Sequence, residues 1–296
     1  MVGEQHGFLL VDKPKGVTSR RVVDVAQQRW PGEKIGHCGT LDPMATGLLV
    51  LAVGKARRLI DFVQQLPKTY VATFRLGVTS ATDDTESELV PAGDPFEIDE
   101  PRLRAAMQAL TGQIMQTPPQ YSAVRVRGRR AHELARSGVR VRLEPRLVRV
   151  YRFELQVFRP PELVATIECG KGTYIRALAR DLGQKLGCGA VMTALKRTTT
   201  GPFRLDDAIP LGALEEPNAP IPPLKPLRDA VQHLPGVVPA APELARLAHG
   251  QPLRMALDLP PGAERVAVLD SEGRLVAVAE YDVARRLLRP RIVLAP

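Results

Sequence analysis

Strand-like and helix-like segments follow one another along this chain without a regular β-α-β repeat. Residues 7–13 have the pattern of a buried strand, and residues 48–53 form a continuous apolar run short enough for a core strand. Between them, Thr18 or Ser19 can cap a helix that runs to about Arg29. A doubly wound sheet needs a helix after each strand. The irregular order therefore predicts an α+β fold with a mixed, mainly antiparallel sheet flanked by helices and loops.

Other patterned segments extend this prediction. Strands are expected at residues 70–78, 145–158, 163–169 and 190–199, and helices around residues 59–63, at 101–111 with Gly112 after the end, and at 173–186 with Gly187 at the end. The strands at 145–158 and 163–169 are expected to pair with each other.

A proline-rich segment divides the chain. Residues 215–226 contain five prolines and predict an extended connector, and a short helix is expected at 227–233. Beyond it, two alternating apolar segments flank the turn sequence at 271–274 and predict a hairpin. We therefore expect a large domain over residues 1–235 and a small β-rich domain over residues 236–296.

The sequence carries no signal for a membrane or for secretion. No apolar run reaches the roughly 18–20 residues that span a bilayer, and the first ten residues lack the basic and apolar regions of a signal peptide. We therefore expect a cytoplasmic protein without membrane contact. The three cysteines, Cys38, Cys169 and Cys188, include no C-x-x-C pair, so we expect reduced thiols rather than a disulfide or a zinc site.

Most of the net charge of +9 comes from one segment. Residues 121–152 contain ten arginines, no lysine and two acids. A guanidinium can grip a phosphate with two hydrogen bonds, so this block predicts a nucleic-acid-binding surface, with a solvated basic face as the alternative. Residues 83–100 carry eight acids and no base, and we expect them to form a solvated loop.

The segment GHCGTLDPMATG, residues 36–47, has the densest local signal. Its three glycines and one proline predict a tight, irregular loop. Pro43 favours an extended backbone at Asp42, so this carboxylate would lie at a sheet edge and face a cleft. Two interpretations remain open: Asp42 stabilises a turn, or it is a catalytic carboxylate.

Several common cofactor motifs are absent from the sequence. Gly54-Lys55 lacks the first glycine and the Ser/Thr of a P-loop, and the segment at 132–136 lacks the second histidine of H-E-x-x-H. No G-x-G-x-x-G occurs. We therefore expect no nucleotide, metal or dinucleotide cofactor.

A basic residue lies in the first turn of the helix expected at 173–186. With Thr173 as the N-cap, Arg176 opposes the helix dipole and needs a compensating anion, either a carboxylate or a phosphate. The alternative is an exposed arginine that pairs with Asp181 or with nothing in particular.

Five segments in order resemble one known family. GHCGTLDPMATGLLVLAVGKARRL is similar to the catalytic signature of the TruB family of bacterial tRNA pseudouridine-55 synthases. GFLLVDKPKGVTS precedes it, and KTYVATFRLGVTSATDD, PPQYSAVRVRGRRAHELARSG and CGKGTYIRALARDLGQKLGCGAVMTALKRTTTGPF follow it. Together they cover most of residues 7–205. LAHGQPL and the hairpin resemble, more weakly, the family's small RNA-binding (PUA-like) domain.

The resemblance implies a pseudouridine-synthase fold with a basic, thumb-like insertion at residues 121–146. It also implies roles in a site that works on tRNA without a metal or other cofactor. Asp42 matches the essential aspartate, and Arg176 matches the arginine that pairs with it. His37 matches a residue that helps extrude the base, and Tyr70 matches the residue that stacks on the flipped base and is a candidate for proton transfer. Tyr174 and Leu195 match residues that line the uridine pocket. The expected RNA backbone contacts are Arg125, Arg127, Arg129 and Arg130.

These roles fit the chemistry of the reaction. The enzyme must break the N1–C1′ bond of uridine, rotate the uracil and rejoin it through C5, and a carboxylate can assist without a cofactor. Asp42 could attack C6, attack C1′ or promote a glycal intermediate. By its pattern alone, Tyr70 would be a core-strand tyrosine.

Two alternatives compete with this interpretation. The related archaeal and eukaryotic class uses a guide RNA, but the chain begins almost directly at the catalytic domain, so we expect no guide RNA. A non-catalytic tRNA-binding or tRNA-folding protein is disfavoured by the joint presence of Asp42, Tyr70 and Arg176, although a second role in tRNA folding stays open. We expect a monomer that acts on the T-arm of tRNA. Cys38 and His132 depart from the family pattern at positions without assigned chemistry.

Overall fold

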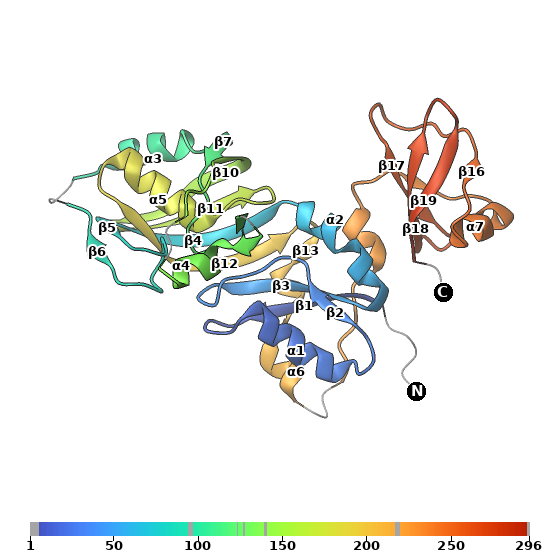
Figure 1. Ribbon diagram of the computed structural model, residues 1–296, viewed down its shortest axis with the longest axis horizontal. Helices are drawn as coiled ribbons and strands as arrows, with labels where there is room; N and C mark the ends of the chain where they lie inside the picture. Colours follow the sequence, from blue (N-terminus) through green and yellow to red (C-terminus); the bar gives the residue numbers. More distant parts are fainter. Residues whose placement is uncertain are drawn as a thin grey trace.

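The larger part of the molecule is built around a mixed ten-stranded sheet (Figure 1). The computed structural model describes residues 6–93, 97–122, 124–126, 128–138, 141–216 and 220–294. The strands of this sheet are β1 (Gly7–Lys13), β2 (Ile35–His37), β3 (Thr46–Val53), β4 (Lys68–Leu76), β7 (Gly112–Gln116), β10 (Arg146–Arg159), β11 (Glu162–Cys169), β12 (Ala190–Thr200), β13 (Phe203–Arg204) and β14 (Ile209–Pro210).

The strand order is β14-β1-β3-β12-β4-β11-β10-β7, with β2 beside β3 and β13 beside β12. Within the described part of the chain, β1 with β14 and β3 with β12 are the parallel pairs of this sheet, and its other pairs are antiparallel. The predicted α+β fold with a mixed, mainly antiparallel sheet is therefore confirmed, as is the pairing of β10 with β11.

Helices pack on this sheet, in the insertion and on the strands of the last part of the chain. They are α1 (Ser19–Arg29), α2 (Ile60–Gln65), α3 (Glu100–Gln108), α4 (Ala131–Arg136), α5 (Ile175–Leu186), α6 (Leu211–Glu215) and α7 (Ala241–Ala248), with 3-10 turns η1 (Gly54–Leu59), η2 (Leu205–Asp207) and η3 (Leu227–Val231). As predicted, Thr18 caps α1, where its hydroxyl accepts from Arg21 N–H at 3.1 Å. α5 packs on β12 and α3 packs on α5, and their apolar sides join one core cluster that includes Phe74 and Leu178 (Figure 1).

Helix α3 ends three residues before the predicted limit. Its start follows from Asp99, whose carboxylate accepts from Arg102 N–H at 2.8 Å. At the other end, the Thr111 hydroxyl donates to the Met107 carbonyl at 3.1 Å, which satisfies that carbonyl outside the helix ladder. The side chain of Thr111 thus takes part in ending the helix, a contact that the apolar pattern does not reveal.

The strand predicted at residues 70–78 is two strands. β4 ends at Leu76 because Gly77 adopts a left-handed φ of 85°, and the chain turns there into β5 (Val78–Thr79). β5 pairs with β6 (Val90–Pro91). Within the insertion, β8 (Arg125–Val126) pairs with β9 (Arg129–Arg130).

The last part of the chain forms a five-stranded sheet, drawn in orange and red in Figure 1. Its strands are β15 (Gly236–Val237), β16 (Leu253–Arg254), β17 (Arg265–Leu269), β18 (Leu275–Asp282) and β19 (Leu287–Val293). The predicted hairpin is confirmed as β17 paired with β18. Leu269 and Val278 share a core cluster with Phe8 of the larger sheet. A domain boundary at residue 236 stays a prediction.

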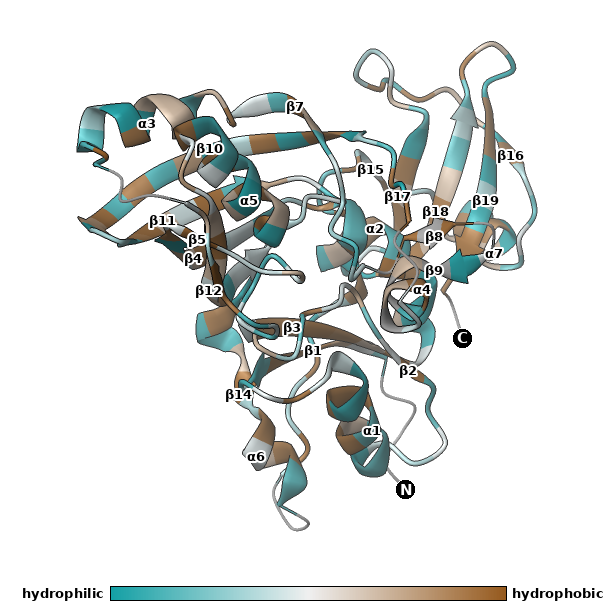
Figure 2. Ribbon diagram, turned by 60° about the vertical axis from the view of Figure 1, so that its left-hand side comes forward, coloured by the Kyte–Doolittle hydropathy of each residue, from teal (hydrophilic) through white to brown (hydrophobic). Residues whose placement is uncertain are grey.

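Hydropathy follows the sheet pattern. Apolar and polar residues alternate along β10 (Figure 2), where Val148 and Val150 are buried and Leu147 and Arg149 face solvent.

Within the described residues, no helix combines the length and the apolar character needed to cross a membrane.

Candidate active site

Asp42 lies in a loop between β2 and β3 that buried hydrogen bonds hold in place. The Ser19 hydroxyl accepts from Leu41 N–H at 2.9 Å and donates to the Leu41 carbonyl at 3.0 Å. Ala45 N–H donates to the Asp42 carbonyl at 3.0 Å and closes a turn. The side chain of Asp42 is 36% exposed. Its carboxylate is therefore fixed by its surroundings and remains open to a substrate.

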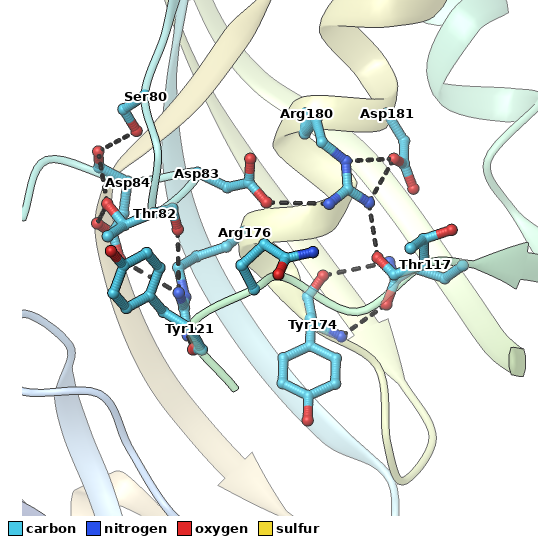
Figure 3. Close-up of polar contacts among 12 residues, drawn as sticks. Ser80, Thr82, Asp83, Asp84, Thr117, Tyr121, Tyr174, Arg176, Arg180 and Asp181 are labelled. Carbon is cyan, nitrogen blue, oxygen red and sulfur yellow. Dashed lines mark hydrogen bonds and ion pairs between the residues drawn. The ribbon is translucent and has the colours of Figure 1, made fainter. Parts of the chain in front are cut away.

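The anion partners of Arg176 are two carboxylates. Its Nε lies 2.9 Å from Asp42 Oδ2 and 3.5 Å from Asp84 Oδ2. Its two terminal nitrogens donate to the carbonyls of Thr82 and Tyr121, each at 3.0 Å (Figure 3). The Arg176 side chain is only 7% exposed. One buried guanidinium thus joins the loop that carries Asp42, the segment after β5, the base of the insertion and helix α5.

The prediction that residues 83–100 form a solvated loop is wrong for Asp83 and Asp84. Asp84 is 1% exposed and accepts from the Thr82 hydroxyl at 2.5 Å. Asp83 lies 3.0 Å from Arg180, and burial raises the pKa of Asp83 while Arg180 opposes that rise. Long-range pairing with α5, which the local composition does not show, buries Asp84 and partly buries Asp83.

The first turn of α5 differs from the prediction in two ways: Thr173 is not its N-cap, and Asp181 pairs with Arg180 instead of Arg176. Thr173 is not the N-cap, because its hydroxyl donates to the Gly170 carbonyl at 3.1 Å. Tyr174 occupies the N-cap position, and Gln116 from β7 accepts from Tyr174 N–H at 2.9 Å and donates to its carbonyl at 3.2 Å. Asp181 pairs with Arg180 at 2.9 Å. The side chain of Gln116 therefore fixes the segment that presents Tyr174.

Tyr70 is buried on β4, opposite Arg197 of β12. Burial raises the pKa of the Tyr70 phenol, and the charge of Arg197 and its hydrogen bond to the phenol act in the opposite sense. The charge of Asp42 also reaches the phenol and raises its pKa. Tyr70 therefore keeps its proton at neutral pH and lies within electrostatic reach of Asp42.

Arg197 is a buried cation that the sequence prediction missed. It is 2% exposed, and its Nε donates to the Leu48 carbonyl at 2.7 Å. Its terminal nitrogens donate to the carbonyls of Gly39 at 3.1 Å and Thr40 at 3.5 Å. Arg197 thus holds the loop that carries Asp42 through two of its carbonyls and β3 through a third, and it also hydrogen-bonds the phenol of Tyr70.

Gly47 lets the loop approach β12, which leads to a stability prediction. A Cβ at Gly47 would lie 2.3 Å from the Arg197 carbonyl oxygen, and Gly47 has φ of 92°. We expect Gly47→Ala to lower the free energy of unfolding by more than the roughly 1–2 kcal/mol of left-handed strain, measured by urea denaturation. Gly16→Ala is the control, because Gly16 has φ of 84° with no atom near its Cβ position. Equal losses in both variants would contradict this account.

Lys13 is a second missed cation. It is completely buried, and its Nζ donates to the carbonyls of Val17 at 2.7 Å, Pro14 at 2.9 Å and Pro43 at 3.3 Å. Burial lowers the pKa of Lys13 to about 8, against the opposing charge of Asp42. Lys13 therefore anchors the residue that follows Asp42.

His37, at the end of β2, is half-buried. Burial lowers its pKa, and the positive charges of Arg197 and Arg20 lower it further. His37 is therefore neutral at pH 7, and an uncharged imidazole at this place can contact a base without a charge penalty.

Removing one of these charges should raise the pKa of His37. We expect Arg20→Ala to raise it, because a guanidinium that repels the imidazolium is lost. The pKa is measured from the NMR titration of the His37 ring. Arg21→Ala is the control, since Arg21 pairs with Glu215 at 3.5 Å. A wild-type pKa of His37 at or above about 6.5 would show that burial and charge do not act as described.

The other predicted pocket residues lie around the same place. Leu195 is buried on β12, where its carbonyl accepts from the Thr46 hydroxyl at 3.3 Å. Tyr174 is half-buried, and burial raises the pKa of its phenol, as does the charge of Asp42. Tyr70, Tyr174 and Arg176 thus all lie within electrostatic reach of Asp42, and Leu195 joins Tyr70 in one core cluster.

The four predicted RNA-contacting arginines belong to the insertion. Arg129 is exposed at the start of β9. Arg127 lies outside the described residues, and for Arg125 and Arg130 only the backbone is described. The insertion has a small core of its own, in which Val124, Ala131 and Leu143 pack beside Tyr174.

The three cysteines are buried free thiols. Burial raises the pKa of Cys38 to about 12 and that of Cys169 to about 11, so neither thiol is a nucleophile at neutral pH. Across the described ranges, no group of three or more His, Cys, Asp or Glu side chains is arranged to hold a metal ion.

Comparison with known proteins identifies the family. The family described as "TruB family pseudouridylate synthase (N terminal domain)" matches residues 26–175, and "tRNA pseudouridylate synthase B C-terminal domain" matches residues 176–221. The chain is 48% identical over 216 residues to tRNA pseudouridine synthase B of Arthrobacter sp. (strain FB24), covering 71% of each protein. It is 42% identical over 283 residues to that of Thermobifida fusca (strain YX), covering 93% of this chain and 94% of the relative.

Solved structures show the same fold. A chain from "Crystal Structure of a Cbf5-Nop10-Gar1 Complex" superposes with a TM-score of 0.77 at 27% identity, covering 98% of this chain and 85% of that one. A chain from "Structure of H/ACA RNP bound to a substrate RNA containing 2'-deoxyuridine" gives a TM-score of 0.75 at 27% identity, covering 99% and 86%. With both family domains matched and relatives aligned over almost its whole length, the chain belongs to the TruB family of pseudouridylate synthases.

Proposed function

We propose that this chain isomerises uridine 55 in the T-loop of tRNA to pseudouridine, with Asp42 as the catalytic carboxylate. The observation that carries the proposal is the pairing of a partly exposed Asp42 with the buried Arg176, at 2.9 Å, in a chain of this family. Relatives that align over more than nine-tenths of the chain are named tRNA pseudouridine synthase B, which supports tRNA as the substrate.

The geometry suits the chemistry of the reaction. The Arg176 guanidinium holds the Asp42 carboxylate in place, and a carboxylate there can act as a nucleophile or stabilise charge at C1′. After the N1–C1′ bond breaks and the uracil rotates, C5 bonds to C1′ and loses its proton, while N1 gains one. No cofactor is needed for these steps. Asp42 has both the charge and the exposure to assist them.

The residues around Asp42 suit an extruded base. Taking a base out of its stack costs a few kcal/mol, and stacking on an aromatic ring returns about 1–3 kcal/mol. We assign the stacking to Tyr70, the lining of the uridine pocket to Tyr174 and Leu195, and help with extrusion to the neutral His37. The hydrogen bond from Arg197 to the Tyr70 phenol fixes the orientation of this ring.

The insertion is proposed to hold the RNA backbone. Arg129 is exposed and available to phosphates, and Arg142, 3.6 Å from Glu144, is 93% exposed. Substituting several arginines between residues 125 and 142 is expected to weaken tRNA binding and to reduce its salt dependence by about 0.7–0.9 in log–log slope for each lost phosphate contact. Binding with unchanged affinity and slope would show that the insertion is not the RNA surface.

Two alternatives remain distinguishable from this proposal. A guide-RNA-dependent enzyme is disfavoured, because the relatives named tRNA pseudouridine synthase B are 36–48% identical, against 27% for the chains from the Cbf5 and H/ACA complexes. A tRNA-folding protein without catalysis is disfavoured by the intact Asp42–Arg176 pair. We propose a monomer that works in the cytoplasm, where its tRNA substrate is found.

The test is direct. The purified chain alone is incubated with an unmodified tRNA transcript, and pseudouridine is located by chemical modification and primer extension. We expect a single modified site in the T-loop without any added RNA. Absence of product, or product only after a guide RNA is added, would refute the proposal.

A further inference from the structure

The first half of β10 carries a group of exposed side chains that the proposed site does not use. Val148 and Val150 point into the core, so Arg149 between them points to the opposite face of the sheet. Tyr151 is 46% exposed beside a register shift between Val150 and Arg152, and the Arg149 guanidinium lies 5.3 Å from the centre of the Tyr151 ring. This cation–π contact holds the guanidinium and leaves N–H groups free.

The backbone of this group lies beside the segment that presents Tyr174. The Arg149 carbonyl accepts from Gly170 N–H at 2.8 Å, in the exposed turn that contains Lys171 and leads to Tyr174. At the start of β10, Arg146 lies opposite Gln116, the residue that holds both backbone groups of Tyr174. The charge of Arg146 reaches the Tyr174 phenol.

Three cations in and beside this segment have no acidic partner in the part of the chain that the structure describes. Among the described residues, no carboxylate lies within 4.0 Å of Arg146, Arg149 or Lys171. Their neighbour Arg152 differs, because it lies 3.3 Å from Glu154 and 3.9 Å from Glu168. The unpaired charges are thus concentrated at the pocket end of β10, where a polyanion passing the pocket would meet them.

We propose that Arg146, Arg149, Tyr151 and Lys171, together the β10 rim, bind the RNA strand that adjoins the extruded uridine. The proposal rests on the proposed function and adds a surface outside the arginine-rich insertion. Arg149 and Lys171 would bind successive phosphates, and Tyr151 would orient the Arg149 guanidinium.

Exposed apolar side chains beside the β10 rim are compatible with a different partner, a protein. Leu147 and Met115 lie opposite each other on β10 and β7, and each is 63% exposed. They would suit a protein contact. The three unpaired cations favour RNA, because a protein partner would have to supply an acid for each of them.

The test compares two charge removals on one face of the sheet. In the full chain, Arg149→Ala with Lys171→Ala removes the unpaired cations, and Arg152→Ala removes an acid-paired one as the matched control. Dissociation constants for an unmodified tRNA transcript are measured from 50 to 200 mM KCl. We expect the double variant to weaken binding by about tenfold or more and to reduce the salt slope by about 1.4–1.8, with Arg152→Ala near wild type. Tyr151→Leu is expected to weaken binding less.

The outcomes separate this proposal from the proposed function. Unchanged affinity and slope in the double variant would overturn the β10 rim, even if the wild type makes pseudouridine. Failure of the wild type to make pseudouridine would refute the proposed function. The comparison of dissociation constants would still test whether the β10 rim binds RNA. A wild-type dimer that the double variant or Leu147→Ser disrupts, without loss of RNA affinity, would make this surface a protein interface. Thermal melts confirm that the exposed substitutions leave the fold intact.

Discussion

Replacing Asp42 by asparagine is expected to reduce pseudouridine formation by at least about 10⁴-fold, as removal of a central catalytic group does in other enzymes. The amide keeps the size of the side chain but cannot act as an anionic nucleophile or stabilise positive charge at C1′. Because Asp42 is 36% exposed, loss of its charge should cost little stability. The measurements are single-turnover rates on an unmodified tRNA transcript and the dissociation constant for the same RNA.

The control for this substitution is Asp61→Asn, the same chemical change at an exposed position in the first turn of α2. It should leave the rate at the wild-type value. Asp42→Asn should still bind tRNA, since the arginines of the insertion are intact. A variant that keeps more than about a tenth of the wild-type rate would exclude Asp42 as the catalytic carboxylate.

Replacing Arg176 by methionine is expected to remove activity and also to lower the free energy of unfolding by about 3–5 kcal/mol. The substitution leaves Asp84, which is 1% exposed, as a buried charge without its cation. It also leaves the carbonyls of Thr82 and Tyr121 without their donor. Urea denaturation measures the loss, and single-turnover kinetics measure the activity.

A double variant separates the two effects of Arg176. Arg176→Met with Asp84→Asn removes the unpaired buried charge, so part of the lost stability should return while activity stays low. Arg180→Met is the control for position in α5, because Arg180 pairs with Asp83 and Asp181 rather than with Asp42. It should lower stability with a much smaller effect on the rate. An active Arg176→Met protein of wild-type stability would contradict the role of the guanidinium.

Local patterns predicted the architecture well because strands and helices of this chain are amphipathic in the usual way. Period-two alternation located β10 and β11, and the Thr18 cap located α1. The pairing of Asp42 with Arg176 came from family resemblance. Without that resemblance, the sequence predicted only that some anion lies near Arg176.

Two site residues carried a signal that the prediction did not use. In β12, Arg197 shares the buried face with Leu195, and in β1, Lys13 shares the buried face with Val11. A charged residue at an inward position of a strand is costly unless it has partners, so a place two residues from a buried apolar residue marks both as candidates for a structural or functional role.

The acidic pair gave no comparable signal. Asp83 and Asp84 lie among six further acids, and composition predicts such a segment to be solvated. Their burial depends on Arg176 and Arg180, about 95 positions further along the chain, which pairing in three dimensions alone brings close. Gln116, which holds Tyr174 through two hydrogen bonds, is hidden from the sequence for the same reason.

The most direct test of the central claim follows the hydrogen at C5 of the target uridine. A tRNA transcript labelled with tritium at C5 of its uridines is incubated with the chain alone, and tritium released to water is counted. Because C5 exchanges its hydrogen for the new bond to C1′, one equivalent of tritium per tRNA is expected from wild type and none from Asp42→Asn. Wild-type protein that releases no tritium, or Asp42→Asn protein that releases a full equivalent, would contradict the account.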